Sequence, residues 1–394
     1  MILLKCKSQI KAVLRFSHNS LKLKLEKTPR ILICPLNWGL GHATRVVPII
    51  HEIIQLKYDV IIAADGIALD FLKQEFPSVK VIQFKSYQVK YSKKSNQVFK
   101  MFFLLLRLIY WTIKEHIVLK KLIAHEKVNV VISDNRFGLW NKSIYTIFIT
   151  HQLRVIFPGI LKLFEPAYQY LLKKIIEQYN ECWIPDFNGK VNLSGQLSHL
   201  KKTYPNTYFI GPLSRFSNKS NNNSIEFEYD FLFILSGPEP QRSIFESICI
   251  QSVKNSKQRI ALVRGINTDS NKTENTNITF FGMLNSNNLL ELIQRSEYIV
   301  CRSGYSSVMD LVALKKRAIL IPTPGQTEQE YLAKYLDESA LFPFQKQNDF
   351  SIENAIKKLN TFSTTPDLTY ENYLIHRIVL LDKIFEKGNK KKCS

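Results

Sequence analysis

Short apolar runs alternate with longer amphipathic segments through the first half of the chain. The run RILICP at 30–35 has the character of a buried strand, and it ends in a turn-rich segment at 37–41. A helical spacing of apolar positions follows at 42–56. Further strands are predicted at 59–64, 79–84, 128–133, 144–150 and 181–184. Because helical segments separate most of these strands, the pattern predicts a parallel, doubly wound α/β sheet.

A second alternating series begins after a polar stretch. Residues 214–224 (SRFSNKSNNNS) are rich in Asn and Ser without periodicity, which predicts a linker. Later strands are predicted at 231–235, 259–263, 278–281, 298–301 and 318–321, and a last helix at 370–387. We therefore expect two tandem Rossmann-like domains with a cleft between them. The expected parts are a basic N-terminal extension (1–29), an N-terminal domain (30–213), a linker (214–229), a C-terminal domain (230–350), and a helix with a basic tail (351–394).

The predicted helix at 98–125 has an apolar density similar to that of a membrane span. Four cations interrupt it at intervals of seven: Lys100, Arg107, Lys114 and Lys121. No uncharged run therefore approaches the roughly 20 residues that a span needs. A seven-residue step drifts by only about 20° around a helix, so the cations form one stripe. A helix that lies in a membrane interface has this pattern, and so does a mostly buried helix with one solvated edge.

Composition narrows the choice of partners. The 394 residues are 45% apolar and 22% charged, which is ordinary for a globular protein, but the formal net charge is +21. Residues 1–214 carry +18 of this charge, residues 215–350 are neutral, and residues 351–394 carry +3. The excess indicates an anionic partner: nucleic acid, an acidic membrane surface or a phosphorylated substrate. The six cysteines form no CxxC pair, which argues against a zinc site or a disulfide scaffold and fits a reducing cytosol.

The turn after the first strand carries the first candidate chemistry. Gly39 and Gly41 let the backbone turn tightly and let a ligand approach the N-terminus of the next helix. Thr44 stands where a dinucleotide fingerprint needs a third glycine, so that fingerprint fails. His42 opens the helix, where the helix dipole disfavours the charged imidazolium. We therefore predict that His42 is a general base, and the alternative is a histidine that only caps the turn.

A strand–loop–helix junction in the second half predicts a phosphate site. Ser303 and Gly304 end the strand, and Ser306 and Ser307 add hydroxyls at the helix N-terminus. Asp310, about a turn and a half into that helix, is placed to accept hydrogen bonds from ribose hydroxyls. The loop and helix after the next strand offer polar side chains to a sugar: Gln326, Gln329 and Glu330.

Asp134 ends the predicted strand at 128–133, in the sequence VVISDNRFG. A carboxylate at this strand end is placed to orient His42, and we predict that role for it. An aspartate that caps the loop is equally consistent with the sequence.

Together these motifs resemble the GT-B glycosyltransferases with a family-28-type C-terminal domain, the group that includes MurG-type N-acetylglucosaminyltransferases. The resemblance covers residues 30–345 and is concentrated at 298–336 and 37–45. It implies that His42 is the base, that His151 lies in the acceptor segment, and that Glu330 replaces the second of two family glutamines. The donor-binding residues that it implies are Gly39, Gly41, Arg215, Ser236, Gly237, Arg264, Arg302, Ser303, Gly304, Asp310, Gln326, Gln329 and Glu330.

The resemblance implies an inverting hexosyltransferase of the GT-B fold. The expected donor is a UDP-linked hexose or N-acetylhexosamine. Helix N-termini and Arg215 would stabilise the departing diphosphate, so neither a metal nor a cofactor is expected. The basic N-terminal half implies contact with the anionic inner face of the cell membrane, and therefore a cytoplasmic, peripheral enzyme of the cell envelope with a lipid-linked or glycolipid acceptor. Nucleic acid is not an expected partner.

Two alternatives stay open. A UDP-sugar 2-epimerase shares this architecture but needs further carboxylates around the sugar, and Glu239 is the only additional candidate near the donor loop. A non-enzymatic nucleic-acid binder would use the net charge, but the chain has no RNP, KH or helix-turn-helix signature.

Overall fold

The computed structural model describes residues 28–87, 97–157, 159–217, 226–266, 277–362 and 373–390. It omits the side chains of 97–106, 160 and 382–390. Most of the predicted extension (1–29) therefore lies outside the described residues, as do positions 218–225 of the predicted linker and the last four residues of the tail. The side chain of Lys100 is likewise outside them.

The first sheet has seven described strands, all parallel, in the order β3-β2-β1-β4-β5-β6-β7. The strands are β1 (Arg30–Pro35), β2 (Asp59–Ala64), β3 (Lys80–Gln83), β4 (Val130–Asp134), β5 (Tyr145–Ile149), β6 (Glu181–Ile184) and β7 (Thr207–Phe209). The helices of this half are α2 (Leu40–Gln55), α3 (Gly66–Glu75), α4 (Gln97–Glu126) and α5 (Glu165–Ile176), with 3-10 turns η1 (Gly159–Phe164) and η2 (Gly195–Leu197).

Alternating side chains of these strands point to opposite faces, as the pleat requires. Ile31 and Ile33 of β1 belong to a core that includes α2 and α3, whereas Leu32 and Cys34 pack with Leu119 of α4. The apolar runs are buried on both faces because helices cover both. α5 packs on the same side as α4, through Leu172 and Ile176 against strands β5 and β6.

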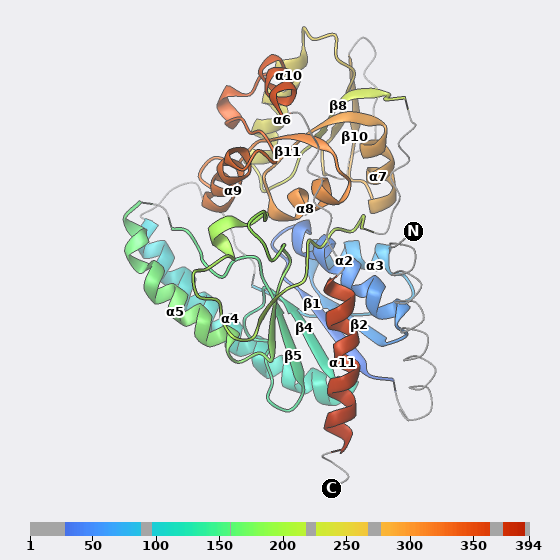
Figure 1. Cartoon of the computed structure of the whole chain (residues 1–394), viewed down its shortest axis with the longest axis vertical. Helices are drawn as coiled ribbons and strands as arrows, with labels where there is room; N and C mark the ends of the chain where they lie inside the picture. Colours follow the sequence, from blue (N-terminus) through green and yellow to red (C-terminus); the bar gives the residue numbers. More distant parts are fainter. Residues whose placement is uncertain are drawn as a thin grey trace.

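The second sheet has five described parallel strands in the order β10-β9-β8-β11-β12. They are β8 (Tyr229–Ile234), β9 (Ile260–Val263), β10 (Ile278–Phe281), β11 (Ser296–Cys301) and β12 (Arg317–Leu320). The helices here are α6 (Gln241–Val253), α7 (Ser286–Gln294), α8 (Tyr305–Ala313), α9 (Thr327–Glu338) and α10 (Ile352–Thr361), with η3 at Gln347–Asp349. The loops at the carboxyl ends of the two sheets face each other, and α2 lies directly below α8 (Figure 1).

The last helix, α11 (Tyr373–Lys390), returns to the first half of the molecule and lies beside α2 (Figure 1). Arg377 forms an ion pair with Glu181 of β6 at 2.6 Å, and its guanidinium lies 3.5 Å from the ring centroid of Tyr208 on β7. The chain thus passes between the two halves twice.

The expected α/β fold with two parallel sheets is confirmed, and the strand at 181–184 has the predicted bounds. Two elements were not predicted. β7 is only three residues long, which is too short for a periodicity, and α10 lies inside the segment expected to hold one helix and a tail. α10 begins at a Ser351 cap whose hydroxyl accepts a hydrogen bond from the Asn354 N–H.

Candidate active site

The carboxyl ends of both sheets face the boundary between the two halves, where the sequence predicts a cleft, and ligands of open α/β sheets bind at such strand ends. In the first sheet, Pro35 of β1 lies opposite Asp134 of β4, and Asp134 lies opposite Ile149 of β5. This register places the loop after β1, the end of β4 and the segment at 150–152 side by side. His42, Asp134 and His151 are therefore neighbours although they are distant in sequence.

His42 and Asp134 are in contact, as predicted from their strand ends. His42 Nδ1 lies 3.1 Å from Asp134 Oδ2, and the carboxylate is fully buried. Arg45, one turn further along α2, is also buried and forms an ion pair with Asp134 through both Nε and Nη2. Burial raises the pKa of Asp134, but Arg45 and His42 outweigh this effect and hold that pKa below its ordinary value. Asp134 is therefore ionised.

Arg45 also determines which nitrogen of His151 carries a proton. Arg45 Nη1 lies 2.9 Å from His151 Nδ1, and because a guanidinium only donates, this nitrogen accepts. The proton is then on Nε2, which lies 2.7 Å from Glu328 Oε1 on α9. Burial lowers the pKa of His151, and although burial raises the pKa of Glu328, the contact with His151 lowers it below normal. A continuous chain of hydrogen bonds thus joins His42 to the opposite side of the cleft.

Other polar contacts hold the two halves together. Ser306 Oγ of α8 donates to the Gly41 carbonyl at 2.8 Å, and Thr327 Oγ1 of α9 donates to the Ile156 carbonyl at 3.0 Å. A Cβ on Gly41 would lie 3.1 Å from Ser306 Oγ, so this close approach favours glycine. Tyr305 stacks on the His151 ring, with centroids 4.2 Å apart and planes inclined by 5°.

Four glycines in the loops at the strand ends face open space. A Cβ at Gly39, Gly237, Gly304 or Gly325 would meet no protein atom within 4 Å. Gly39, Gly237 and Gly325 have positive φ, and this backbone conformation by itself favours glycine at the three positions. Gly304 has an ordinary φ of −71°, so neither its backbone nor a protein neighbour requires glycine. It precedes the N-terminus of α8, where N–H groups are available to an anion.

The polar residues predicted for the donor site have partners inside the protein. Ser303 donates to the Gln329 carbonyl at 2.8 Å, and Gln329 accepts from the Thr323 N–H at 2.9 Å. Arg215 pairs with Asp310 at 3.3 Å. Burial raises the pKa of Asp310 although Arg215 opposes the shift. Arg215 and Asp310 therefore lie together as predicted neighbours of a ligand, but in this structure they bind each other.

The structure gives Arg302 a different place from the one expected. Its side chain is 1% exposed, its guanidinium binds Gln347 and the Gln241 carbonyl, and it stacks on Phe245 at 4.2 Å. Burial lowers its pKa to about 10. Arg302 therefore binds the segments around Gln241 and Gln347 from within and does not reach the surface.

The remaining predicted donor residues lie at or near the surface. Arg264 follows β9 and pairs with Glu246 at 2.7 Å. Ser236 is exposed, Gln326 is half-buried, and Glu330 accepts from the Gly325 N–H at 2.8 Å. Glu239, the carboxylate considered for epimerase chemistry, is exposed and pairs with Arg242 at 2.6 Å.

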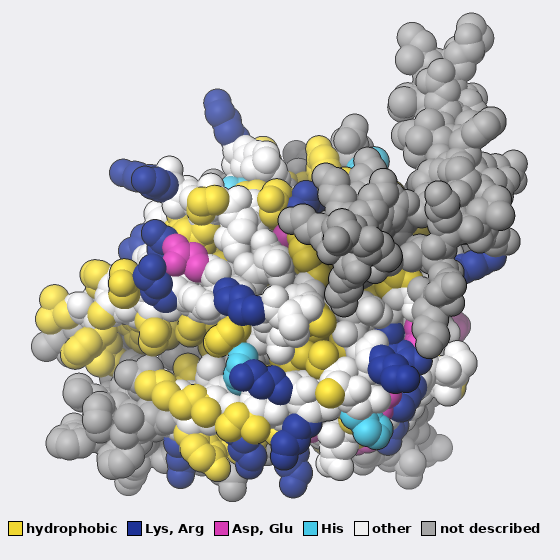
Figure 2. Space-filling model, turned by 90° about the horizontal axis from the view of Figure 1, so that it is seen from below, with side chains coloured by type: hydrophobic (Ala, Val, Ile, Leu, Met, Phe, Trp, Pro, Cys, Tyr) yellow, Lys and Arg dark blue, Asp and Glu magenta, His cyan; other side chains and the backbone are white. Residues whose placement is uncertain are grey.

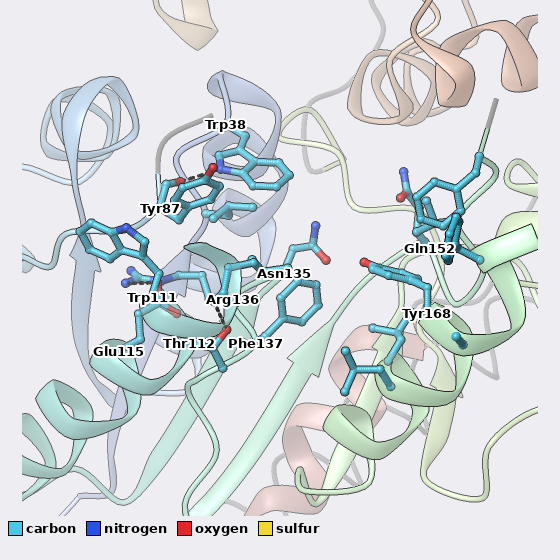
Figure 3. A pocket seen from close by; sticks show the side chains of 18 of the residues that line it. Trp38, Tyr87, Trp111, Thr112, Glu115, Asn135, Arg136, Phe137, Gln152 and Tyr168 are labelled. Atoms are coloured by element: carbon cyan, nitrogen blue, oxygen red, sulfur yellow. Dashed lines mark hydrogen bonds and ion pairs between the residues drawn. The ribbon is translucent and has the colours of Figure 1, made fainter. Parts of the chain in front are cut away.

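A large apolar cavity lies between α4, α5 and the strand ends (Figure 3). It adjoins the hydrogen-bonded residues His42, Arg45, Asp134, His151 and Glu328, which we call the proton network. Its volume is about 550 Å³. Trp38, Asn135 and Gln152 line it, and these residues adjoin the glycine loop, Asp134 and His151 in the sequence. A smaller cavity of about 200 Å³ shares six lining residues with it and extends outward between α4 and α5.

The outer faces of α4 and α5 are apolar and exposed. Ile109, Tyr110 and Ile113 of α4 are 44–60% exposed, so the mostly buried helix considered from the sequence is wrong for the described part of α4. Arg107, Lys114 and Lys121 are exposed on the same helix. The view from below shows apolar side chains beside Lys and Arg on this part of the molecule (Figure 2). Among the described residues, no helix is long and apolar enough to cross a membrane.

Sequence reasoning missed Arg45, Glu328 and the cavity. Arg45 ends the segment 37–45, but nothing in that segment distinguishes a surface arginine from one that binds a buried aspartate. Glu328 directly precedes Gln329 and Glu330, and nothing in the sequence favours it over these two residues. The cavity arises from residues on separate elements, and only the folded arrangement brings them together.

Residues 231–373 match the model of the glycosyltransferase family 28 C-terminal domain. No curated protein matches the chain significantly. Similar solved structures include the glycotransferase of kitacinnamycin, with a TM-score of 0.58 and 11% identity over 91% of this chain and 94% of that one. MurG of Acinetobacter baumannii has a TM-score of 0.53 and 11% identity over 90% and 99%. UGT89C1 of Arabidopsis thaliana, complexed with UDP-L-rhamnose, has a TM-score of 0.56 and 12% identity over 90% and 94%.

Proposed function

We propose that this chain, a glycosyltransferase of the GT-B fold with a family 28 C-terminal domain, moves a hexose or N-acetylhexosamine from a UDP-sugar to an acceptor hydroxyl with inversion. The contact between His42 and Asp134 at the cleft carries the proposal. It supplies a base on one side of the cleft, opposite the glycine-lined N-terminus of α8. UDP-L-rhamnose is bound by the Arabidopsis structure, which supports a UDP-linked donor.

The base must act through Nε2 of His42. With a proton on Nδ1, the ring donates to Asp134 Oδ2, and the Nε2 lone pair is free to accept. Arg45 Nη2 lies 2.8 Å from the same Nδ1 and would favour the other tautomer, in which Nε2 carries the proton. Asp134 and Arg45 therefore compete for His42, and the proposed reaction uses the form bound to Asp134.

In the reaction, the acceptor oxygen attacks C1 of the sugar and its proton goes to His42 Nε2. The bond from C1 to the diphosphate oxygen breaks, and UDP leaves with both electrons. N–H groups at the start of α8, next to Gly304, would stabilise the developing negative charge. Arg215 would contribute only after exchanging Asp310 for the diphosphate.

Membrane contact is the second part of the proposal. The exposed apolar side chains of α4 and α5 would enter the interface, and Arg107, Lys114 and Lys121 would meet anionic head groups. This orientation would bring a lipid-linked or glycolipid acceptor to the N-terminal side of the cleft on the cytoplasmic face of the membrane.

Thermal unfolding in the presence of UDP-sugars tests the donor. A ligand that binds only the folded chain raises its Tm, by an amount that grows with concentration above Kd. We expect at least one UDP-hexose or UDP-N-acetylhexosamine, and UDP itself, to raise the Tm, while UMP serves as the control with a smaller shift. If no nucleotide sugar raises the Tm, the proposed donor is wrong.

A further inference from the structure

We propose that the cavity between α4 and α5 binds the apolar body of the acceptor, and that Asn135 and Tyr168 bind a polar group of this molecule. The occupant is an alcohol with a carbon skeleton long enough to fill the cavity, and its hydroxyl would face His42. This inference rests on the proposed function, because it names the class of acceptor for the same reaction.

The size and lining of the cavity fit a small molecule. Its volume of about 550 Å³ falls within the range of about 300–1,000 Å³ for small-molecule sites. The walls are mainly apolar, with Leu36, Val155 and Leu172 among them. The adjoining smaller cavity is lined by Ile109 and Ile113, whose side chains are also exposed on the outer face. An apolar path therefore leads from the surface of α4 to the proton network.

Two polar groups in this apolar lining are left for a ligand. Among the described residues, the side chains of Asn135 and Tyr168 have no hydrogen-bond partner. Figure 3 shows both directed into the cavity from opposite sides. In contrast, Thr112 donates to the Leu108 carbonyl and Trp38 donates to the Tyr87 carbonyl. A hydroxyl both donates and accepts, so it can pair with an amide or with a phenol.

Asn135 also has a left-handed backbone, with φ of 56°. Non-glycine residues in this conformation are strained, and they gather at functional sites. Its neighbours on both sides are fixed: Asp134 binds Arg45, and Arg136 binds Glu115 of α4 at 2.9 Å. The carboxamide is thus held at the boundary between the cavity and the proton network.

A fluorescence experiment tests the cavity directly. The probe is N-phenyl-1-naphthylamine, whose emission rises in a dry apolar site, and it is titrated into the full chain. We expect Ala167→Trp, which fills the cavity from α5, to reduce probe affinity at least tenfold. Ile67→Trp on exposed α3 adds the same side chain outside the cavity and should change nothing. Equal probe binding by Ala167→Trp and the unaltered chain would overturn the proposal.

Displacement of the probe by 1-decanol tests the polar pair. Asn135→Gly removes the carboxamide while its backbone suits glycine, and Tyr168→Phe removes only the hydroxyl. At least one of the two variants should bind decanol about 3- to 10-fold more weakly, as expected for one lost hydrogen bond, and both should bind the probe normally. Unchanged decanol affinity in both variants would contradict the assignment.

The same variants separate this inference from the proposed function. All of them should keep the Tm increase caused by the UDP-sugar, because the cavity lies away from the donor side. If decanol displaces the probe but no nucleotide sugar stabilises the chain, the alcohol site stands and sugar transfer fails. If the sugar stabilises the chain but acidic vesicles alone displace the probe, the face binds membrane and the acceptor assignment fails.

Discussion

The two sides of the cleft differ in how their side chains are used. On the C-terminal side, Arg215 is bound to Asp310, and Gly237 and Gly304 leave open space. On the N-terminal side, Arg45 joins Asp134 to His151 in one buried network. The first side offers backbone groups to a ligand, and the second offers titratable side chains. A nucleotide diphosphate suits the first, and proton transfer suits the second.

This difference also explains the distribution of charge. The C-terminal half, which would bind an anionic donor, is neutral over 215–350, whereas residues 1–214 carry +18. A diphosphate held by helix N-termini does not need an excess of cations. The excess lies instead on the half that holds the cavity and the exposed face of α4. If this comparison is correct, substitutions on the N-terminal side will change the rate of sugar transfer, and substitutions on the C-terminal side will change the affinity for the donor.

The largest expected effect is the loss of chemistry in His42→Ala. The rate of sugar transfer should fall by about 10²–10⁴-fold, because a general base contributes that much, while the Kd for UDP-sugar stays the same. Transfer of radiolabel from the UDP-sugar to a lipid extract measures the rate. His51→Ala, an exposed histidine of the same helix, is the control. Full sugar transfer by His42→Ala would mean that His42 is not the general base and that the N-terminal side does not carry out proton transfer.

Removing the centre of the network should destabilise the fold. Arg45→Met leaves Asp134 buried without its arginine, and we expect the free energy of unfolding to fall by about 3–5 kcal/mol. Arg154→Met breaks an ion pair with Glu165 in which the arginine side chain is 39% exposed, so it should cost less than about 1 kcal/mol. Urea denaturation measures both. Similar values for the two variants would mean that the network is no stronger than a surface pair.

The sequence predicted the C-terminal side more fully than the N-terminal side, for a physical reason. The junction between β11 and α8 is made by consecutive residues, so the strand end, the segment with Ser303 and Gly304, and the start of the helix can be recognised from the sequence alone. Even there the sequence did not show that Arg302 turns inward, because burial depends on Gln347 and Phe245, which are distant in sequence.

On the N-terminal side, the strand ends predicted that His42 and Asp134 would meet, and they do. The sequence could not predict that Arg45 would join them to His151, because that contact depends on the register of β4 with β5. The cavity was equally hidden, since its walls come from α4, α5, η1 and the loops after β1, β3, β4 and β5. The spacing of cations on α4 was visible from the sequence, but the apolar side chains that remain exposed between them were not.

Neutralising the cations of α4 tests the membrane-facing part of the comparison. In the triple variant Arg107→Gln, Lys114→Gln, Lys121→Gln, binding to phosphatidylglycerol vesicles should weaken roughly 100-fold, at about 1 kcal/mol per cation. Donor affinity should not change. The control neutralises three exposed lysines elsewhere in this half: Lys190, Lys201 and Lys202. An equal loss in the control would mean that net charge alone, and not this helix, draws the chain to the membrane.

A smaller effect is expected from Gly304→Ala on the opposite side. The added methyl group meets no protein atom within 4 Å and the backbone φ is ordinary, so the free energy of unfolding should change by less than about 1 kcal/mol. If a diphosphate occupies that space, its affinity should fall about tenfold. Titration calorimetry with UDP measures this. Gly189→Ala, at an exposed turn, is the control, and equal UDP affinity in both variants would leave Gly304 outside the donor site.

The smallest effect is the dependence of stability on pH, which arises from the N-terminal side and its contact with Glu328. The pKa of His151 is lowered in the folded chain, so below its ordinary value of 6.5 the unfolded chain takes up a proton that the folded chain refuses. The pKa values of Asp134 and Glu328 are also lowered, so the stability that they contribute is lost as the pH falls further through those lowered values. Both effects act in the same direction. Between pH 7 and pH 5 we therefore expect the free energy of unfolding to decrease as the pH falls, because burial lowers the pKa of His151. In His151→Gln, which cannot titrate, urea denaturation should show a flatter profile over this interval, and an unchanged slope would mean that another group titrates there.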